Sequence, residues 1–442
     1  PFTYDRVDLR GLTGLIYVSL QCINCELYLP ESGSLSVLIM KAVTLPSSCC
    51  DVLGRTLTHS PKLKRLSIHH TDLHNCLLDL SNMTELTVLD VLKVTLSISC
   101  CDVLGSTLTH CTKLKTLKIY KTDIHNCVLD LSNMTELTVL DMLNVTLSSS
   151  CCDLLGCTLT HCTKLKKFKI YNTDFHNCLF DISNMTELTV LDMLKVTLSS
   201  RCCDVLGTSL VHCTKLKTLK IHNTNLHNCR LDVSNMRELT VLKMSEVTLT
   251  SICRDVLFRT LTHCTKLEEL SIHHADLHNC LLDLSKMTEL MILDMSEVTL
   301  STRCCDVIGR TLTNCRKLKT LNIRDSHLHN CQLDLSNMKE LTDLDMSGVT
   351  WSSSWDTIFS MLSHCPKLVR LMVTRLTSKN NYCVSPRMEV GGLHGGRILC
   401  MVLALGSLSM LDTHVMLLLV ILLLSVMVIK ILIDCILRWW HN

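Results

Sequence analysis

One stretch of about fifty residues is copied along most of the 442-residue chain, and this repetition limits the fold more than any other feature. The clearest copy runs from Cys111 to His161, and the next begins at Cys162 with nearly the same residues. An aspartate recurs at intervals of 51 residues, at Asp51, Asp102, Asp153, Asp204, Asp255 and Asp306. Repetition at a fixed period is typical of a solenoid, in which each copy stacks on the one before it.

Each copy contains two smaller units that share one apolar spacing. The first unit reads L-x-x-L-x-I from Leu114, and the second reads L-x-x-L-x-M from Leu137. This spacing is the core of a leucine-rich repeat, and the unit starts are separated alternately by 23 and 28 residues. The sequence therefore predicts an α/β leucine-rich-repeat solenoid, a horseshoe with a parallel concave β-sheet of about fifteen strands.

Two positions within the copy carry further structural expectations. The usual Asn or Cys of the repeat core is replaced by residues such as Thr122 and Val145, so backbone groups at that turn need other partners. The segment from Ser150 to Cys162 predicts a short helix, with Ser150 as its cap and Asp153 in its first turn. The shorter return segment, residues 125–134, is expected to be extended or to form a 3₁₀ turn.

Cysteine is abundant, with 29 residues, but it follows the period of the repeat. Buried free cysteine packs as a small hydrophobe, and adjacent cysteines pair poorly in disulfides. These patterns favour reduced thiols and a reducing compartment. The recurring His-x-Cys pairs, such as His125 with Cys127, offer two ligands per copy, whereas a zinc site needs four. Neither a metal site nor a unique catalytic Cys–His pair is expected, and the sequence indicates no cofactor and no enzymatic activity.

Two columns of residues are predicted to line the concave face in the middle of the arc. One alternates acid and base and predicts a structural ladder of cross-strand ion pairs, a self-neutralised face that fixes the strand order; its members are Asp90, Lys118, Asp141, Lys169, Asp192 and Lys220. The other is apolar and aromatic, and it is either a partner-binding stripe or an incidental surface; its members are Leu92, Tyr120, Leu143, Tyr171, Leu194 and His222.

The C-terminal part of the sequence has a different composition from the repeats. We expect a solenoid over residues 1–376, a linker over 377–413, a hydrophobic helix over 414–438 and a short tail over 439–442. Residues 415–437 reach the length of a membrane-spanning helix at the cost of two charges, with an end-cap helix as the alternative. Because the first copy is already in register, we also expect the chain to be a piece of a longer protein.

Composition excludes some classes of partner. The net charge is +2, which gives no general preference for nucleic acid, and aromatic residues make up 4% of the chain, too few for a base-stacking platform. A protein or microbial ligand on the concave face is the partner that we expect.

The pattern of a helix, a cysteine and a leucine-rich strand, as in Asp102 to Ile119, resembles the repeat region of NACHT-type (NLR) innate immune receptors. The resemblance covers about residues 10–376. It implies a non-enzymatic sensor or autoinhibitory solenoid with its repeats in the cytoplasm, which the C-terminal helix could anchor to a membrane. A nucleotide-binding module precedes the repeats in that family, and this sequence contains no phosphate-binding loop.

A second interpretation is a membrane-anchored receptor ectodomain similar to a Toll-like receptor. Sequons at Asn82, Asn133, Asn144 and Asn184 could carry glycans in such a protein. Asn144 is expected on the concave face, where a glycan would obstruct binding. Disulfides and occupied sequons would favour this alternative, and free thiols with bare sequons would favour the cytoplasmic one.

Overall fold

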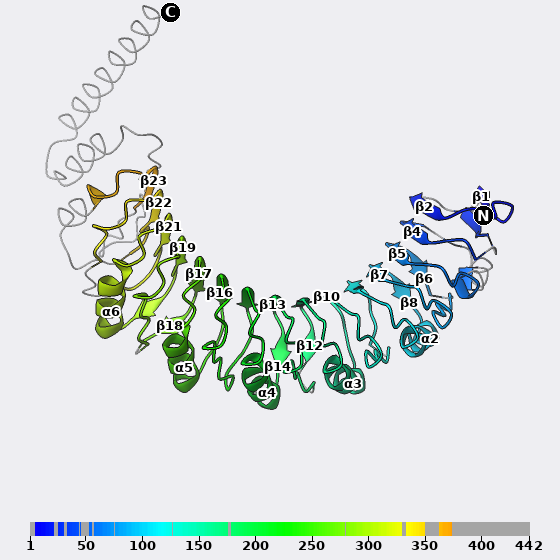
Figure 1. The fold of residues 1–442 in the computed structure, drawn as a ribbon, viewed down its shortest axis with the longest axis horizontal. Helices are drawn as coiled ribbons and strands as arrows, with labels where there is room; N and C mark the ends of the chain where they lie inside the picture. The colour runs from blue at the N-terminus through cyan, green and yellow to red at the C-terminus, as the bar shows by residue number, and fades with distance from the viewer. Residues whose placement is uncertain are drawn as a thin grey trace, which may run out of the picture.

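The computed structural model forms one long arc (Figure 1). The structure describes residues 5–21, 25–30, 33–43, 45, 53–54, 57–74, 76–125, 127–175, 178–278, 280–328, 333–349 and 362–373.

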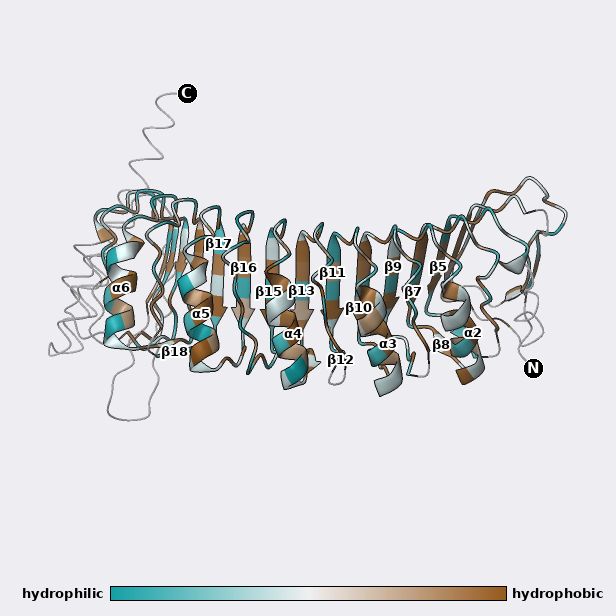
Figure 2. Cartoon of the chain, turned by 60° about the horizontal axis from the view of Figure 1, so that its bottom comes forward, coloured by the Kyte–Doolittle hydropathy of each residue, from teal (hydrophilic) through white to brown (hydrophobic). Residues whose placement is uncertain are grey.

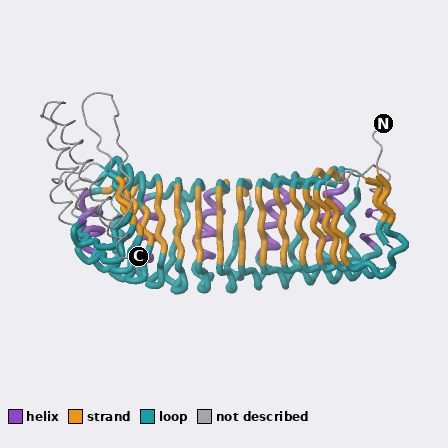
Figure 3. Tube along the Cα trace, turned by 90° about the horizontal axis from the view of Figure 1, so that it is seen from above, coloured by secondary structure: helices purple, strands orange, loops and turns teal. Residues whose placement is uncertain are grey.

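A single parallel sheet of 15 strands lines the inner side of the arc, as the repeat spacing predicts (Figures 1 and 3). Within each strand the buried residues alternate with outward-facing ones, as in Thr116–Tyr120, where Leu117 and Ile119 are buried. The strands, in sheet order, are β2 Tyr17–Gln21, β4 Val37–Lys41, β5 Arg65–His69, β7 Val88–Leu92, β9 Thr116–Tyr120, β10 Val139–Leu143, β11 Lys167–Tyr171, β13 Val190–Leu194, β15 Thr218–His222, β16 Val241–Ser245, β17 Glu269–His273, β19 Ile292–Asp294, β21 Thr320–Asn322, β22 Asp343–Asp345 and β23 Arg370–Met372.

Four small parallel pairs lie outside this sheet. They are β1 Asp5–Asp8 with β3 Cys25–Tyr28, β6 Asp72–Leu73 with β8 Thr95–Leu96, β12 Asp174–Phe175 with β14 Thr197–Leu198, and β18 Asp276–Leu277 with β20 Thr299–Leu300. Three of these pairs join the segments that follow neighbouring concave strands, so they extend the strand stacking toward the outer side.

Helices cover the outer side of the arc, one in each described long unit (Figures 1 and 2). They are α2 Ile98–Leu108, α3 Ser149–Leu159, α4 Ser200–Leu210, α5 Ser251–Leu261 and α6 Thr302–Leu312. The predicted cap of α3 is wrong by two residues, because the Ser148 hydroxyl, rather than that of Ser150, accepts the Cys151 N–H. Asp153 consequently lies beyond the first turn. The predicted apolar face is correct, with Cys152, Leu155 and Leu159 buried.

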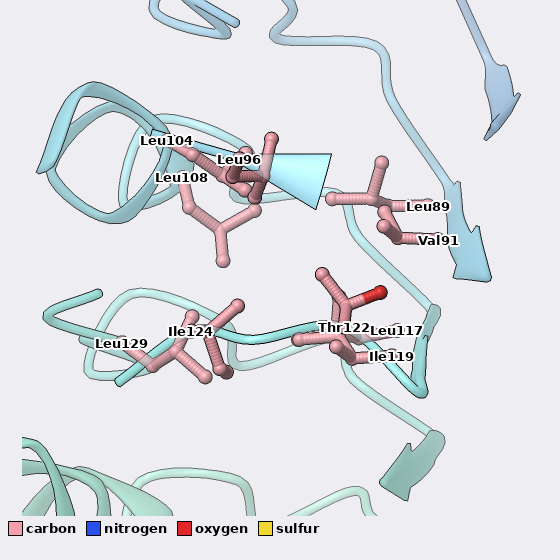
Figure 4. Close-up of a pocket in the computed structure, with 10 residues that line it drawn as sticks. All are labelled: Leu89, Val91, Leu96, Leu104, Leu108, Leu117, Ile119, Thr122, Ile124 and Leu129. Carbon is pink, nitrogen blue, oxygen red and sulfur yellow. The ribbon is translucent and has the colours of Figure 1, made fainter. Parts of the chain in front are cut away.

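The core behind the sheet is filled differently in neighbouring copies. In one copy the Phe180 ring packs against two others, with its centroid 5.4 Å from that of Phe168 and 5.7 Å from that of Phe175. One copy earlier, Leu117, Ile124 and Leu129 occupy the same positions and line a small apolar cavity that α2 closes with Leu104 and Leu108 (Figure 4). This cavity lies inside the core and offers no polar group for ligand recognition except the Thr122 hydroxyl.

In the turn after a concave strand, threonine hydroxyls bond backbone groups that the asparagine of the usual repeat would otherwise bond. The Thr122 and Thr224 hydroxyls accept the N–H groups of Val94 and Val196, both at 3.4 Å, from the preceding unit. Immediately before these threonines the chain takes a positive φ at non-glycine residues, such as Lys121 with φ 49°. That conformation directs the Lys121 N–H to Leu143 O, at 2.7 Å, so the ladder of hydrogen bonds continues past the strand.

The return segment of the short unit contains no helix in its described residues. It combines extended backbone with a turn of the 3₁₀ type, in which the Met134 N–H donates to Leu131 O at 2.9 Å, so both predicted alternatives are present. The predicted linker, the hydrophobic helix of residues 414–438 and the tail all lie outside the described residues. Among the residues that are described, no helix has the length and apolar character needed to cross a membrane.

Candidate functional site

The predicted apolar stripe forms one continuous row across six neighbouring strands. Leu92, Tyr120 and Leu143 are direct register partners on β7, β9 and β10. The row continues through Tyr171, Leu194 and His222 on β11, β13 and β15. All six side chains are half-buried instead of fully exposed. The residues therefore lie in the row that the sequence predicts, but their side chains are less exposed than predicted.

The predicted acid–base column also forms a row, but its ion pairs do not form. Asp90, Lys118 and Asp141 are register partners, as are Lys169, Asp192 and Lys220 farther along. No carboxylate in the described part of the chain lies within ion-pair distance of the Lys118, Lys169 or Lys220 ammonium group. Neighbouring positions on parallel strands thus do not ensure that long side chains meet, since lysine can extend into solvent.

Tyrosine hydroxyls take the place of lysine at two of these aspartates. The Tyr120 hydroxyl donates to Asp141 Oδ2 at 2.6 Å, and the Tyr171 hydroxyl donates to Asp192 Oδ2 at 2.8 Å. Both aspartates are buried, with 9% and 8% of their surface exposed. Burial, together with the hydrogen bond to a carboxylate, raises the pKa of each tyrosine above its usual value. Asp141 Oδ1 is buried and has no hydrogen-bond partner.

Histidine replaces tyrosine at the equivalent positions elsewhere in the row. His222 Nδ1 lies 2.6 Å from Ser245 Oγ, and His69 Nε2 lies 3.4 Å from Asp90 Oδ2. Burial lowers the pKa of His222, which favours its neutral form. The concave face therefore changes from tyrosine–aspartate pairs to histidine–serine pairs between β13 and β16.

A ladder of ion pairs does exist, in a column that the sequence analysis missed. Lysines that directly precede the first core leucine of the short units reach back to glutamates at the same position in the long units. The pairs are Lys113–Glu85, Lys164–Glu136, Lys215–Glu187, Lys266–Glu238, Lys317–Glu289 and Lys367–Glu340. The alternation of T-E-L and T-K-L at one repeat position is the sequence signal for this rim ladder.

The His-x-Cys pairs do not converge on a common point. Where described, the histidine of each pair is exposed, as at His125, and the cysteine is buried, as at Cys127. Within the described residues, no group of three or more His, Cys, Asp or Glu side chains could hold a metal ion. His176 and His329 of this column lie outside the described residues.

Most described cysteines are free and buried in the core. Burial raises the pKa of Cys111 and Cys162 to about 12, so these thiols are protonated and poor nucleophiles near neutral pH. Several donate to backbone carbonyls of the neighbouring unit, as Cys152 Sγ does to Asp174 O at 3.3 Å. Cys76 departs from the expectation of reduced thiols, because it is disulfide-bonded.

Solved structures with a similar fold include three bacterial proteins. An internalin (inlF) from Listeria monocytogenes is 17% identical with a TM-score of 0.54, covering 85% of this chain and 90% of its own. The functional domain of InlJ from the same bacterium, which includes a cysteine ladder, is 19% identical with a TM-score of 0.56 and coverages of 83% and 72%. The Leptospira interrogans LRR protein LIC12759 is 12% identical with a TM-score of 0.54 and coverages of 84% and 94%.

The chain has the leucine-rich-repeat fold. These likenesses confirm the fold that the repeat spacing predicts. Because the sequence identities are low, the likenesses show the fold alone. Comparison with protein-family models and with curated protein sequences gives no match.

Proposed function

We propose that the concave face of the solenoid recognises a polypeptide ligand and catalyses no reaction. The observation that carries this proposal is the continuous row from Leu92 to His222 across six strands. Half-buried leucine and tyrosine side chains offer apolar area at low entropic cost, and tyrosine is favoured at binding surfaces. Rows of this kind on a rigid sheet suit recognition, because the sheet holds the side chains in place before binding.

In the finer form of the proposal, this surface belongs to a sensor or autoinhibitory region like that of NLR receptors, with its repeats in the cytoplasm. The free thiols of the described core support a reducing compartment. Attachment to a membrane through residues 415–437 is part of the proposal and rests on their sequence alone.

Site-specific photocrosslinking in the native cell type tests the recognition surface. A photoreactive residue at Leu143 or Leu194 is expected to crosslink a polypeptide, whereas one at Ile252, which is 61% exposed on helix α5, is expected not to. The crosslinked polypeptide must then bind the purified chain and lose affinity for the Leu143→Arg variant. Equal crosslinking from both faces, or unchanged affinity of that variant, would overturn the proposal.

A membrane-anchored receptor ectodomain is the second candidate, and the Cys76 disulfide favours it. Asn82, Asn133 and Asn184 are exposed, as acceptor sites must be, and Asn144 follows β10 in the turn instead of lying on the strand. Intact mass of the native protein, with and without thiol alkylation and glycosidase, separates the candidates. Full alkylation without a glycan shift supports the cytoplasmic solenoid, and glycans on these sequons support the ectodomain.

A further inference from the structure

Three lysines share the central outward position of alternate concave strands without a described acidic partner. Lys118, Lys169 and Lys220 occupy the central outward position of β9, β11 and β15 and make no ion pair with any described carboxylate. The next lysine of the row, Lys243, pairs with Glu269 at 2.6 Å, so the unpaired series ends there.

The aspartates between these lysines accept hydrogen bonds from tyrosine instead of pairing with a lysine. Asp141 and Asp192 are buried and lie beneath the hydroxyls of Tyr120 and Tyr171. Lys118, Lys169 and Lys220 are themselves half-buried, so an acidic ligand reaches them only by lying close against the sheet. Exposed lysines lie around this row and make no ion pair with any described carboxylate. Lys115, Lys166 and Lys217 directly precede β9, β11 and β15, Lys121 follows β9, and Lys195 follows the intervening strand β13.

The basic section has a defined end. At the repeat position of Lys115, Lys166 and Lys217, the next copy has Glu268, and Glu269 follows it. Glu246 and Glu297 replace lysine in the turn that follows the strands. The concave face therefore carries more lysine than acid from β9 to β15 and more acid than lysine beyond β16, where Lys319 alone returns at the repeat position of Lys115.

The spacing of the three lysines selects one backbone conformation for a ligand that follows the arc. Lys118 and Lys169 are two strand intervals apart, as are Lys169 and Lys220, which is roughly 9.6 Å at about 4.8 Å per interval. A polyproline II helix has about three residues per turn and rises about 3.1 Å per residue, so every third side chain returns to one face after about 9.3 Å. A β-strand instead places every second residue on one face, at about 6.7 Å.

We propose that Lys118, Lys169 and Lys220 bind an acidic polypeptide segment in the polyproline II conformation, with Asp or Glu at every third position. The proposal rests on the recognition function proposed above and specifies its ligand. The segment crosses the strands along the arc, and its intervening residues pack on the parallel row of Tyr120, Leu143 and Tyr171. Aromatic-lined surfaces suit this helix, because it is preformed and loses little entropy on binding.

Fluorescence anisotropy with labelled synthetic peptides tests the charge and the spacing together. The probe is (Glu-Pro-Pro)₅, and its controls are the isomer Glu₅Pro₁₀, with equal charge but no period, and neutral (Gln-Pro-Pro)₅. The periodic acidic peptide is expected to bind the purified chain about tenfold more tightly than its isomer, and the neutral peptide is expected not to bind. Its affinity is expected to fall as salt concentration rises.

Matched variants locate the binding site. The triple variant K118Q/K169Q/K220Q is expected to weaken binding of the periodic peptide about tenfold. The control R237Q/K286Q/K339Q removes three exposed charges from turns outside the row and is expected to leave the affinity unchanged. Matching thermal unfolding curves for both variants exclude a folding defect.

Three results would overturn the proposal: equal binding of the isomer, unchanged binding by the first triple variant, or preferential binding of a single-stranded oligonucleotide. Failure here is distinguishable from failure of the recognition function. If the polypeptide crosslinked through Leu143 still requires the concave face while these peptides do not bind, only the ligand assignment is wrong.

Discussion

The two halves of the concave face share one backbone and present different chemistry. Between β9 and β13, tyrosines donate to buried aspartates, and Lys118 and Lys169 pair with no carboxylate among the described residues. From β15 to β19, histidines bridge to serines, as His273 does to Ser296 at 2.5 Å, and Lys243 pairs with Glu269. The period of 51 residues fixes inward leucines, which every copy needs for stacking, and leaves the outward positions free to differ. The outward positions therefore carry the chemical differences between the two regions.

The largest expected effect concerns the core behind the first half. Phe175→Ala is expected to lower the free energy of unfolding by about 3–5 kcal/mol, because a buried ring and its edge contact with Phe180 are lost. Leu226→Ala, the matched position in the next copy, is expected to cost less, since it removes fewer atoms and no ring contact. Urea unfolding of the full chain measures both. A larger loss for Leu226→Ala would contradict this account of the core.

Tyr171→Phe tests the tyrosine–aspartate pair directly. The variant leaves Asp192 Oδ2 buried without its donor, so we expect a loss of about 1–3 kcal/mol in the free energy of unfolding. Adding Asp192→Asn should cost less in the Tyr171→Phe background than in the wild type, because the two groups interact. Additive losses in this double-mutant cycle would show that the hydrogen bond contributes nothing.

The second half is expected to respond to acid through His222. Burial lowers its pKa in the folded state, so the unfolded chain binds the proton first as pH falls through about 6.5. The free energy of unfolding should therefore be fully retained above that pH and should decrease below it. His222→Gln is expected to flatten this dependence between about pH 7 and 5. An unchanged pH profile in urea unfolding would rule out this histidine as its source.

The rim ladder should have the smallest effect and should not distinguish the halves. Glu136 and Glu238 belong to the two halves, and each pairs with a lysine at an exposed site. Because exposed ion pairs contribute little, neutralising either glutamate with glutamine is expected to leave the thermal midpoint unchanged within error. A clear shift from one variant alone would indicate a local role that exposure does not predict.

The repeat spacing alone was sufficient to predict the fold and the order of the residues along the concave face. The period determined strand number, register and core columns, because burying every leucine requires stacked units. It could not determine which side chains meet across strands. Lys118 and Asp141 are register partners, yet the carboxylate accepts its bond from Tyr120, whose rigid ring spans the gap between strands.

Other features depend on local geometry that the pattern does not encode. The cap at Ser148 is decided by where the chain leaves the preceding turn, and Ser150 has the same chemistry two residues later. The Cys76 disulfide has no signature in the cysteine columns, since equivalent positions such as Cys127 hold free thiols.

Lysine footprinting of the chain in its native cell extract tests most directly whether the concave face from β9 to β15 is the recognition surface. Acetylation of Lys118, Lys169 and Lys220, measured by mass spectrometry, would be compared between the extract and the purified chain. The account predicts that these three lysines are protected in the extract, whereas Lys286 and Lys339 react equally in both. Equal reactivity of all five lysines in the two samples would contradict the claim that this surface binds a polypeptide.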